Sequence, residues 1–178
     1  MSIEQLPAAA PPAEAPAPAV RPRRRPAGRR GRGDNRPLPV LRRELLGVVA
    51  ATMPTADLEA VGRAFDFAVV AHEGQLRATD EPYVTHPIAA ALMLAELGLD
   101  AQSIEAALLH DVPEDTEYSL NDVEERFGPE VAQLVDGVTK LSKFSTHSHE
   151  EQQAENIRKM LLAMAADIRV VLIKLADR

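Results

Sequence analysis

From Leu38 onward, apolar residues recur at steps of three and four, the spacing that places them on one face of an α-helix. The pattern predicts a short first helix over 41–51, stopped before Pro54, and a longer one from an N-cap at Thr55 to about His72. Further helices are expected over 86–97, 101–109, 119–127, 130–141, 151–165 and 167–178. No stretch longer than four residues alternates as a strand would, so the predicted fold class is all-α.

Polar residues near the ends of these segments support the expected boundaries. Asp100 is placed to cap the helix over 101–109, and Ser119 and Asp122 have the spacing of a capping box. The segment 75–85 contains the run Asp80, Glu81 and Pro82 and is expected to be irregular.

The segment 140–150 carries Ser, Thr and two histidines without periodicity and is expected to be a mobile loop. His147 and His149 have a spacing that could bind metal. Because they lie in a loop of this kind, we favour the interpretation that these two histidines do not bind metal.

Residues 1–37 are rich in Pro, Ala and Arg and hold too few large apolar residues to offset the entropy of ordering, which predicts a disordered tail. The basic run 21–32 could bind the phosphates of RNA or of a ribosome, but it has no aromatic residue for base stacking. A solvated tail without a partner is the alternative, and we favour it. Residues 38–178 are expected to form one domain.

Charge is unevenly distributed along the 178 residues. Residues 1–40 carry eight Arg and three acidic residues, a net charge of +5, whereas the remainder carries 12 basic and 24 acidic side chains, a net charge of −12. The chain has no Cys, which excludes disulfides and thiolate metal ligands. No apolar run approaches the roughly 20 residues that a membrane span needs, and no cleavable leader is evident. These features predict a cytoplasmic protein without a membrane partner.

The candidate chemistry is concentrated where an apolar run leads to His110 and Asp111, followed by Glu114 and Asp115. Crowding three carboxylates and an imidazole within six residues at the end of a buried helix is costly without a cation. A divalent metal would offset that cost, and imidazole with carboxylate suits Mn, Fe or Zn. The alternative is an acidic loop that caps a helix.

Six segments of the chain resemble, in order and spacing, the hydrolase domain of RelA/SpoT-type proteins. They are Ala71–Gln75, Glu81–Pro87, Leu108–Thr116, Phe127–Ser142, Gln153–Met164 and Ile173–Arg178. The resemblance covers roughly residues 40–178. Proteins of this type control the alarmone (p)ppGpp in the stringent response, and their hydrolase domain belongs to the HD-type metal phosphohydrolases. The resemblance therefore implies a helical HD-domain bundle.

The resemblance also implies one Mn²⁺ ion held by four side chains: His86, His110, Asp111 and Asp177. It implies that Glu114 and Asp115 hold and deprotonate the attacking water, and that Arg77 contacts the guanine nucleotide. Taken singly, these residues have structural alternatives: a helix-start histidine, a salt-bridged acid, a capping loop or a surface charge. The chain departs from the family at Ala78, where a second basic residue is common, and this bears on nucleotide affinity rather than on the chemistry.

The implied reaction is metal-dependent hydrolysis of the 3′-diphosphate of ppGpp or pppGpp, which gives GDP or GTP and pyrophosphate. Two alternatives stay open: an HD phosphohydrolase that acts on another nucleotide, and a regulatory HD module without catalysis. The complete set of acidic and histidine residues favours activity. In the family the helix that holds Asp177 continues into further nucleotide contacts, so the chain resembles an incomplete domain of a longer protein that also carries a synthetase. We expect such a piece to have low stability.

Overall fold

The structure of the chain is a computed structural model, which describes residues 36–142, 158 and 166–178. Its helices are α1 Leu38–Thr52, α2 Leu58–Ala71, α3 Thr85–Glu96, α4 Ala101–Leu109, α5 Val112–Asp115, α6 Leu120–Phe127, α7 Pro129–Ser142 and α9 Ile168–Asp177. These residues contain no strand, only an isolated bridge between Leu76 and Pro82. The prediction of an all-α fold is confirmed.

Parts of the sequence-based prediction lie outside the described residues. They are the tail over 1–35, the loop over 143–150 with His147 and His149, and most of the helix over 151–165. Within the part of the chain that is described, no helix combines the length and the apolar character needed to cross a membrane.

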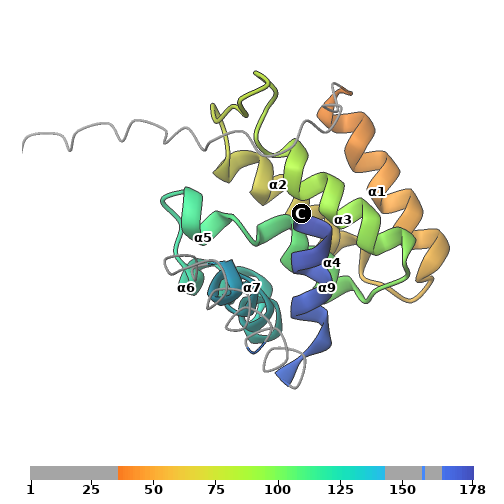
Figure 1. Cartoon of the computed structure of the whole chain (residues 1–178). Helices are drawn as coiled ribbons and strands as arrows, with labels where there is room; N and C mark the ends of the chain where they lie inside the picture. The colour runs from red at the N-terminus through yellow and green to blue at the C-terminus, as the bar shows by residue number, and fades with distance from the viewer. Residues whose placement is uncertain (1–35, 143–157, 159–165) are drawn as a thin grey trace, which may run out of the picture.

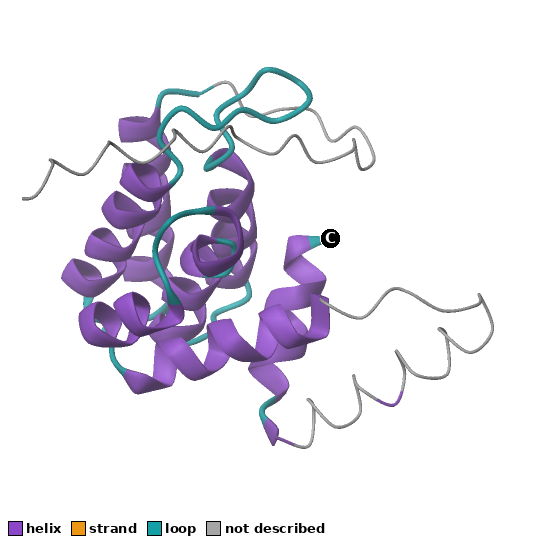
Figure 2. Cartoon of the chain, turned by 90° about the vertical axis from the view of Figure 1, so that its left-hand side faces the viewer, coloured by secondary structure: helices purple, strands orange, loops and turns teal. Residues whose placement is uncertain are grey.

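Helix α4 lies at the centre of the bundle. Every residue from Ser103 to Leu109 is buried, and α4 packs against α2, α3, α7 and α9. Figure 1 shows α9 beside α4, with its C-terminal end near α3, and Figure 2 shows the bundle from the side. A helix covered on all sides is largely apolar around its circumference, which accounts for the run Ala106–Leu109. This buried helix delivers His110 to the interior.

Local capping interactions set several helix starts as the sequence predicts. The Asp100 carboxylate accepts hydrogen bonds from the Ser103 backbone N–H at 3.0 Å and the Ser103 hydroxyl at 2.9 Å, so the N-cap of α4 is confirmed. Ser119 and Asp122 form the expected capping box at the start of α6. Gly128 has φ of 88°, a left-handed backbone conformation that glycine adopts without strain, and it separates α6 from α7.

Three boundary predictions need correction. The N-cap of α2 is Asp57 rather than Thr55, because the Asp57 carboxylate accepts from the backbone N–H groups of Glu59 and Ala60. Helix α1 begins at Leu38 rather than at 41, since a proline is tolerated in the first turn of a helix. The expected acidic loop is the single-turn helix α5, in which Glu114 and Asp115 occupy the first turn.

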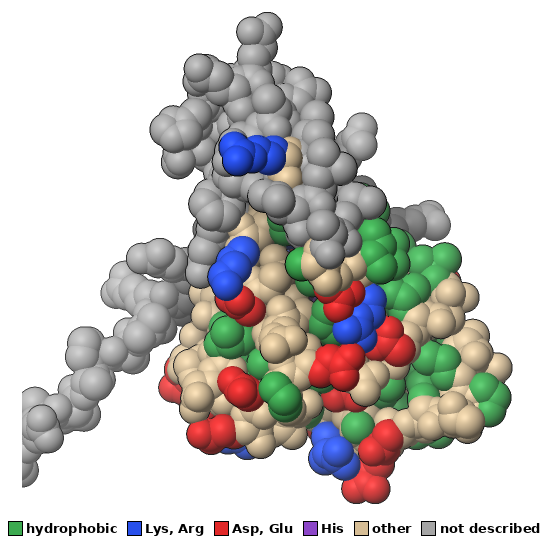
Figure 3. Space-filling model, turned by 90° about the horizontal axis from the view of Figure 1, so that it is seen from below, with side chains coloured by type: hydrophobic (Ala, Val, Ile, Leu, Met, Phe, Trp, Pro, Cys, Tyr) green, Lys and Arg blue, Asp and Glu red, His purple; other side chains and the backbone are tan. Residues whose placement is uncertain are grey.

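Acidic residues outnumber basic residues in 41–178. Figure 3 shows acidic side chains spread over one face, with basic side chains lying among them. Apolar side chains are also exposed on α9, where Ile168 and Leu175 lie at the surface.

Candidate metal centre

The four side chains predicted to bind metal lie together at the ends of three helices. His86 is in the first turn of α3, His110 and Asp111 join α4 to α5, and Asp177 is the last residue of α9. Each offers one ligand atom, and these four atoms all lie within 4.8 Å of one another. Residues up to 91 positions apart therefore meet at one point because α3 and α9 both pack on α4.

The distances within the cluster show how closely the donor atoms are packed. His86 Nε2 lies 2.7 Å from Asp177 Oδ1. His110 Nε2 lies 3.3 Å from Asp177 Oδ1 and 3.4 Å from Asp111 Oδ1. Two imidazoles and two carboxylates form a mixed nitrogen and oxygen set, and such a set can hold a divalent transition metal.

His110 is held in the tautomer that a metal ligand requires. Its Nδ1 lies 2.8 Å from the carbonyl oxygen of Ala107 and must donate to it, which leaves the lone pair on Nε2. Among the described residues, this buried Nε2 has no hydrogen bond of good geometry, although two carboxylate oxygens lie near it. A lone pair that faces carboxylate oxygens is repulsive unless a cation or a proton lies between them. The residues therefore fit a metal ion.

The neighbouring groups favour the charged forms of both His110 and Asp177. Burial lowers the pKa of His110, but the nearby carboxylates of Asp177 and Asp111 outweigh burial and raise it. Burial raises the pKa of Asp177, yet the close imidazoles of His110 and His86 and the hydrogen bond from Lys174 hold that pKa well below its usual range. Lys174 donates to Asp177 Oδ2 at 2.6 Å, which leaves Oδ1 facing the two histidines. The cluster is thus set to attract positive charge.

Helix α5 brings the predicted catalytic pair next to this cluster. The hydroxyl of Tyr83 lies 2.6 Å from Asp111 Oδ2 and 3.0 Å from Asp115 Oδ2, so a single phenol bridges a predicted ligand and a predicted catalytic acid. Since one hydroxyl carries one proton, it can donate to one of these carboxylates at a time. Glu114 Oε1 is buried and makes no hydrogen bond within the described residues.

The sequence prediction did not assign roles to Tyr83 or Lys174, which the structure places at the cluster. Both lie in segments that resemble the family, Glu81–Pro87 and Ile173–Arg178, so the signal was present. What the sequence could not supply was the direction of their side chains. Arg77, predicted to contact nucleotide, lies in the loop between α2 and α3 with an exposed side chain.

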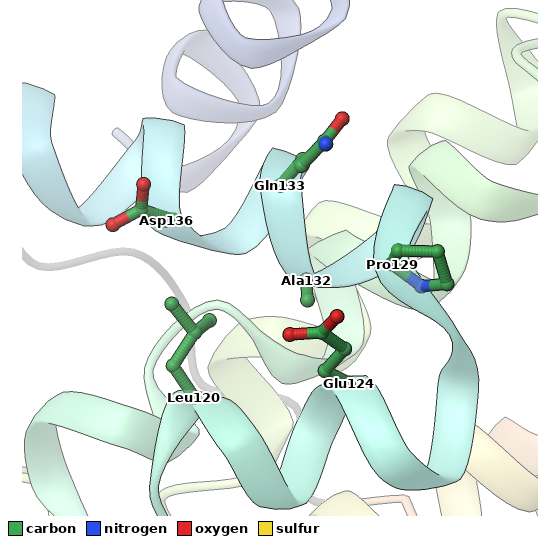
Figure 4. A pocket seen from close by; sticks show the side chains of 6 residues that line it. All are labelled: Leu120, Glu124, Pro129, Ala132, Gln133 and Asp136. Atoms are coloured by element: carbon green, nitrogen blue, oxygen red, sulfur yellow. The ribbon is translucent and has the colours of Figure 1, made fainter.

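A separate shallow groove of about 150 Å³ lies between α6 and α7 (Figure 4). It is lined by Leu120, Glu124, Pro129, Ala132, Gln133 and Asp136. None of the residues predicted to bind metal or nucleotide lines it. The candidate chemistry therefore stays with the His and Asp cluster.

Comparison with known proteins gives a family and several relatives. A family model described as HD domain matches residues 64–178. The chain is 50% identical over 131 residues to the bifunctional (p)ppGpp synthase/hydrolase SpoT of Escherichia coli (strain K12), covering 74% of this chain and 19% of that protein. It is 55% identical over 128 residues to a GTP pyrophosphokinase of Myxococcus xanthus, covering 70% of this chain and 17% of that protein.

A solved structure described as a metazoan ortholog of SpoT that hydrolyzes ppGpp and plays a role in starvation responses is also similar. Its TM-score is 0.51 at 34% sequence identity, with 66% of this chain and 65% of that chain covered. The chain spans about a fifth of the length of the curated relatives described above.

Proposed function

The chain belongs to the HD domain family, and on that premise we propose that it is the hydrolase domain of a RelA/SpoT-type protein. The proposed reaction is hydrolysis of the 3′-diphosphate of ppGpp or pppGpp to GDP or GTP and pyrophosphate. The observation that carries this proposal is the convergence of His86, His110, Asp111 and Asp177 beside the acidic pair of α5. The 50% sequence identity with a protein named as a (p)ppGpp synthase/hydrolase supports the substrate class.

We propose Mn²⁺ as the ion, as the resemblance to the RelA/SpoT-type hydrolase domain implies, and a set of two imidazoles and two carboxylates permits it. The four clustered side chains would hold it. When bound, a divalent cation neutralises phosphate charge and lowers the pKa of a coordinated water.

The side chains of this chain have separate tasks in the proposed reaction. Glu114 and Asp115 orient the attacking water and take its proton, as carboxylates placed within reach of a water can. The water oxygen forms a bond to the phosphorus attached to the ribose 3′ oxygen, and the bond between that phosphorus and the 3′ oxygen breaks. The proton returns to the 3′ oxygen of the nucleoside product. Arg77 is proposed to contact the guanine nucleotide, since a guanidinium can stack on a base or pair with phosphate.

Two parts of the proposal concern the whole protein rather than this domain. A synthetase activity in the same protein is supported by the name of the Escherichia coli relative. A contact with RNA or a ribosome through the basic run 21–32 stays a prediction, because this segment lies outside the described residues.

The experiment that tests the function measures pyrophosphate release from ppGpp by the natural full-length protein, with Mn²⁺ and with a chelator. We expect turnover that requires the metal and is lost in Asp111→Ala. Asp136→Ala is the matched control, because Asp136 lies on α7, pairs with Lys140 and does not belong to the cluster. Glu114→Gln should retain metal binding and lower kcat by about 10²–10⁴-fold.

The outcomes separate the alternatives. A folded, metal-loaded protein that turns over no nucleotide would support a regulatory HD module. Turnover of another nucleotide but not of ppGpp would support a different HD phosphohydrolase. Equal loss of activity in Asp111→Ala and Asp136→Ala would contradict the assigned metal centre.

A further inference from the structure

The segment between α2 and α3 holds Asp115 at two places. The Tyr83 hydroxyl lies 3.0 Å from the Asp115 carboxylate, and the Gln75 side-chain amide donates to the Asp115 carbonyl oxygen at 2.7 Å. The backbone carbonyl oxygen of Gln75 also accepts a hydrogen bond from the Tyr83 backbone N–H, at 2.9 Å. The two contacts to Asp115 are therefore tied to each other within this segment.

The Asp115 carbonyl sets which way the Gln75 amide points, and His72 supports that orientation. A backbone carbonyl can only accept, so the Gln75 atom beside Asp115 is the NH₂ group and Oε1 faces His72. His72 Nδ1 lies 2.9 Å from Gln75 Oε1. Since this oxygen can only accept, Nδ1 must carry the proton and donate it. His72 is only 2% exposed, and its ring lies 5.0 Å from the Tyr83 ring between centroids. Burial lowers the pKa of His72, which keeps the ring neutral with its proton on Nδ1.

Helix α5 needs such support because it is a single turn. It comprises four residues, and one turn of helix is not stable by itself. The last carbonyl groups of a helix also lack partners within the helix, and Asp115 is the last residue of α5. The Gln75 amide supplies a partner from a segment 40 residues earlier in the chain.

We infer that His72, Gln75 and Tyr83 form a brace that sets the position of Asp115, and with it the water-orienting pair, relative to the metal cluster. Gln75 and His72 are positioning residues, because they act through Asp115 and not on substrate. The inference rests on the proposed function for its kinetic consequence. Its structural consequence, a better ordered α5, is independent of any reaction.

The test compares Gln75→Met with the unaltered full-length protein. Methionine keeps the length of the side chain and removes both hydrogen bonds. We expect kcat for ppGpp to fall about 10–100-fold, with KM and Mn²⁺ affinity unchanged, because a small displacement of a catalytic group is costly while the four ligands stay in place. Hydrogen exchange should quicken at the Asp115 and Thr116 amides, which donate to the carbonyl groups of Asp111 and Val112.

A matched control and a rescue separate positioning from general stability. Ser119→Ala removes the side-chain cap of α6, just beyond α5, and should leave kcat and the exchange of α5 unchanged. His72→Asn keeps an N–H donor near the position of Nδ1 and should retain most of the activity, whereas His72→Leu should behave like Gln75→Met.

The results that would overturn the brace differ from those that would overturn the function. Unchanged exchange of the Asp115 and Thr116 amides in Gln75→Met would overturn the brace. So would equal loss of kcat in His72→Asn and His72→Leu. If the unaltered protein releases no pyrophosphate from ppGpp, the proposed function fails, while the exchange measurement still tests the brace.

Discussion

Glu105 is a buried acid of α4 that does not belong to the metal cluster. Its side chain is 6% exposed, and burial raises its pKa from 4.5 to about 7. Arg63 acts in the opposite direction, while Asp57 and Asp100 add to the effect of burial. An acid with a raised pKa binds its proton more tightly in the folded state than in the unfolded state. Its ionisation therefore opposes folding at neutral pH.

We expect Glu105→Gln to stabilise the protein at pH 8 but not at pH 4.5. Below the unfolded pKa both states are protonated and no penalty exists. The penalty grows between pH 4.5 and about 7, and above this range it amounts to about 3 kcal/mol. Urea unfolding at the two pH values measures the difference. Glu125→Gln, on the exposed surface of α6, should change the free energy of unfolding by less than about 0.5 kcal/mol at either pH.

At this scale, the sequence predicted the candidate ligands but not the residues that orient them. The His110 and Asp111 pair can be identified from the sequence because these polar residues directly follow an apolar run. His86 and Asp177 were identified through the resemblance. Lys174 and Gln75 lie in segments that resemble the family, but the sequence does not show the hydrogen bonds that give them their roles, because their partners are brought near by folding.

At the scale of elements, the contact between α7 and α9 is close because one of the two helices presents a glycine. A Cβ atom added at Gly137 would lie 2.8 Å from Val170 Cγ2 and 3.0 Å from Val170 Cγ1. Val170 is buried, so it has little room to move away. The glycine allows α9, which carries Asp177, to approach α7.

We expect Gly137→Ala to destabilise the protein by about 1–2 kcal/mol, although alanine favours helix, because overpacking at this contact outweighs helix propensity. Gly47→Ala is the matched control on α1. An added Cβ there meets no atom within 4 Å, so we expect a gain of about 0.5–1 kcal/mol. Thermal unfolding of both variants measures the contrast. Adding Val170→Ala to Gly137→Ala should restore part of the loss, and stabilisation by Gly137→Ala alone would contradict the steric argument.

Local signals account for the helix boundaries that were predicted correctly. Asp100 and the pair Ser119 and Asp122 cap helices through contacts within three residues, which the sequence shows directly. Thr55 was a wrong choice because a better acceptor, Asp57, follows it closely. Helix α5 was missed because a single turn has no measurable periodicity and depends on packing from other elements.

At the scale of the whole molecule, Arg169 joins the starts of three helices. Its guanidinium donates to Asp167 at the N-cap of α9, to Asp100 at the N-cap of α4 and to Glu130 in the first turn of α7. The hydrogen bond with Asp167 is the largest influence and raises the pKa of Arg169, although burial opposes it. No sequence pattern reveals this arrangement, since its partners lie 2, 69 and 39 residues away.

The position of Arg169 predicts that stability and metal binding are coupled through α9. Arg169→Met should lower the free energy of unfolding by about 1–2 kcal/mol, after allowance for the partial exposure of the side chain to water. It should also weaken Mn²⁺ binding, because Arg169 holds the start of α9 and the end of the same helix carries the metal ligand Asp177. Calorimetric titration with Mn²⁺ and urea unfolding of the same samples measure the two effects.

The control for this coupling is Arg42→Met. Arg42 makes a two-point contact with Asp66, but both side chains are exposed and neither lies on a helix that supplies a ligand. We expect a loss of less than about 1 kcal/mol and unchanged Mn²⁺ affinity. If Arg169→Met lowers stability while Mn²⁺ affinity stays at the level of Arg42→Met, the start of α9 does not control the position of Asp177. A parallel fall in both quantities would instead show that the helix bundle assembles the metal centre as one unit.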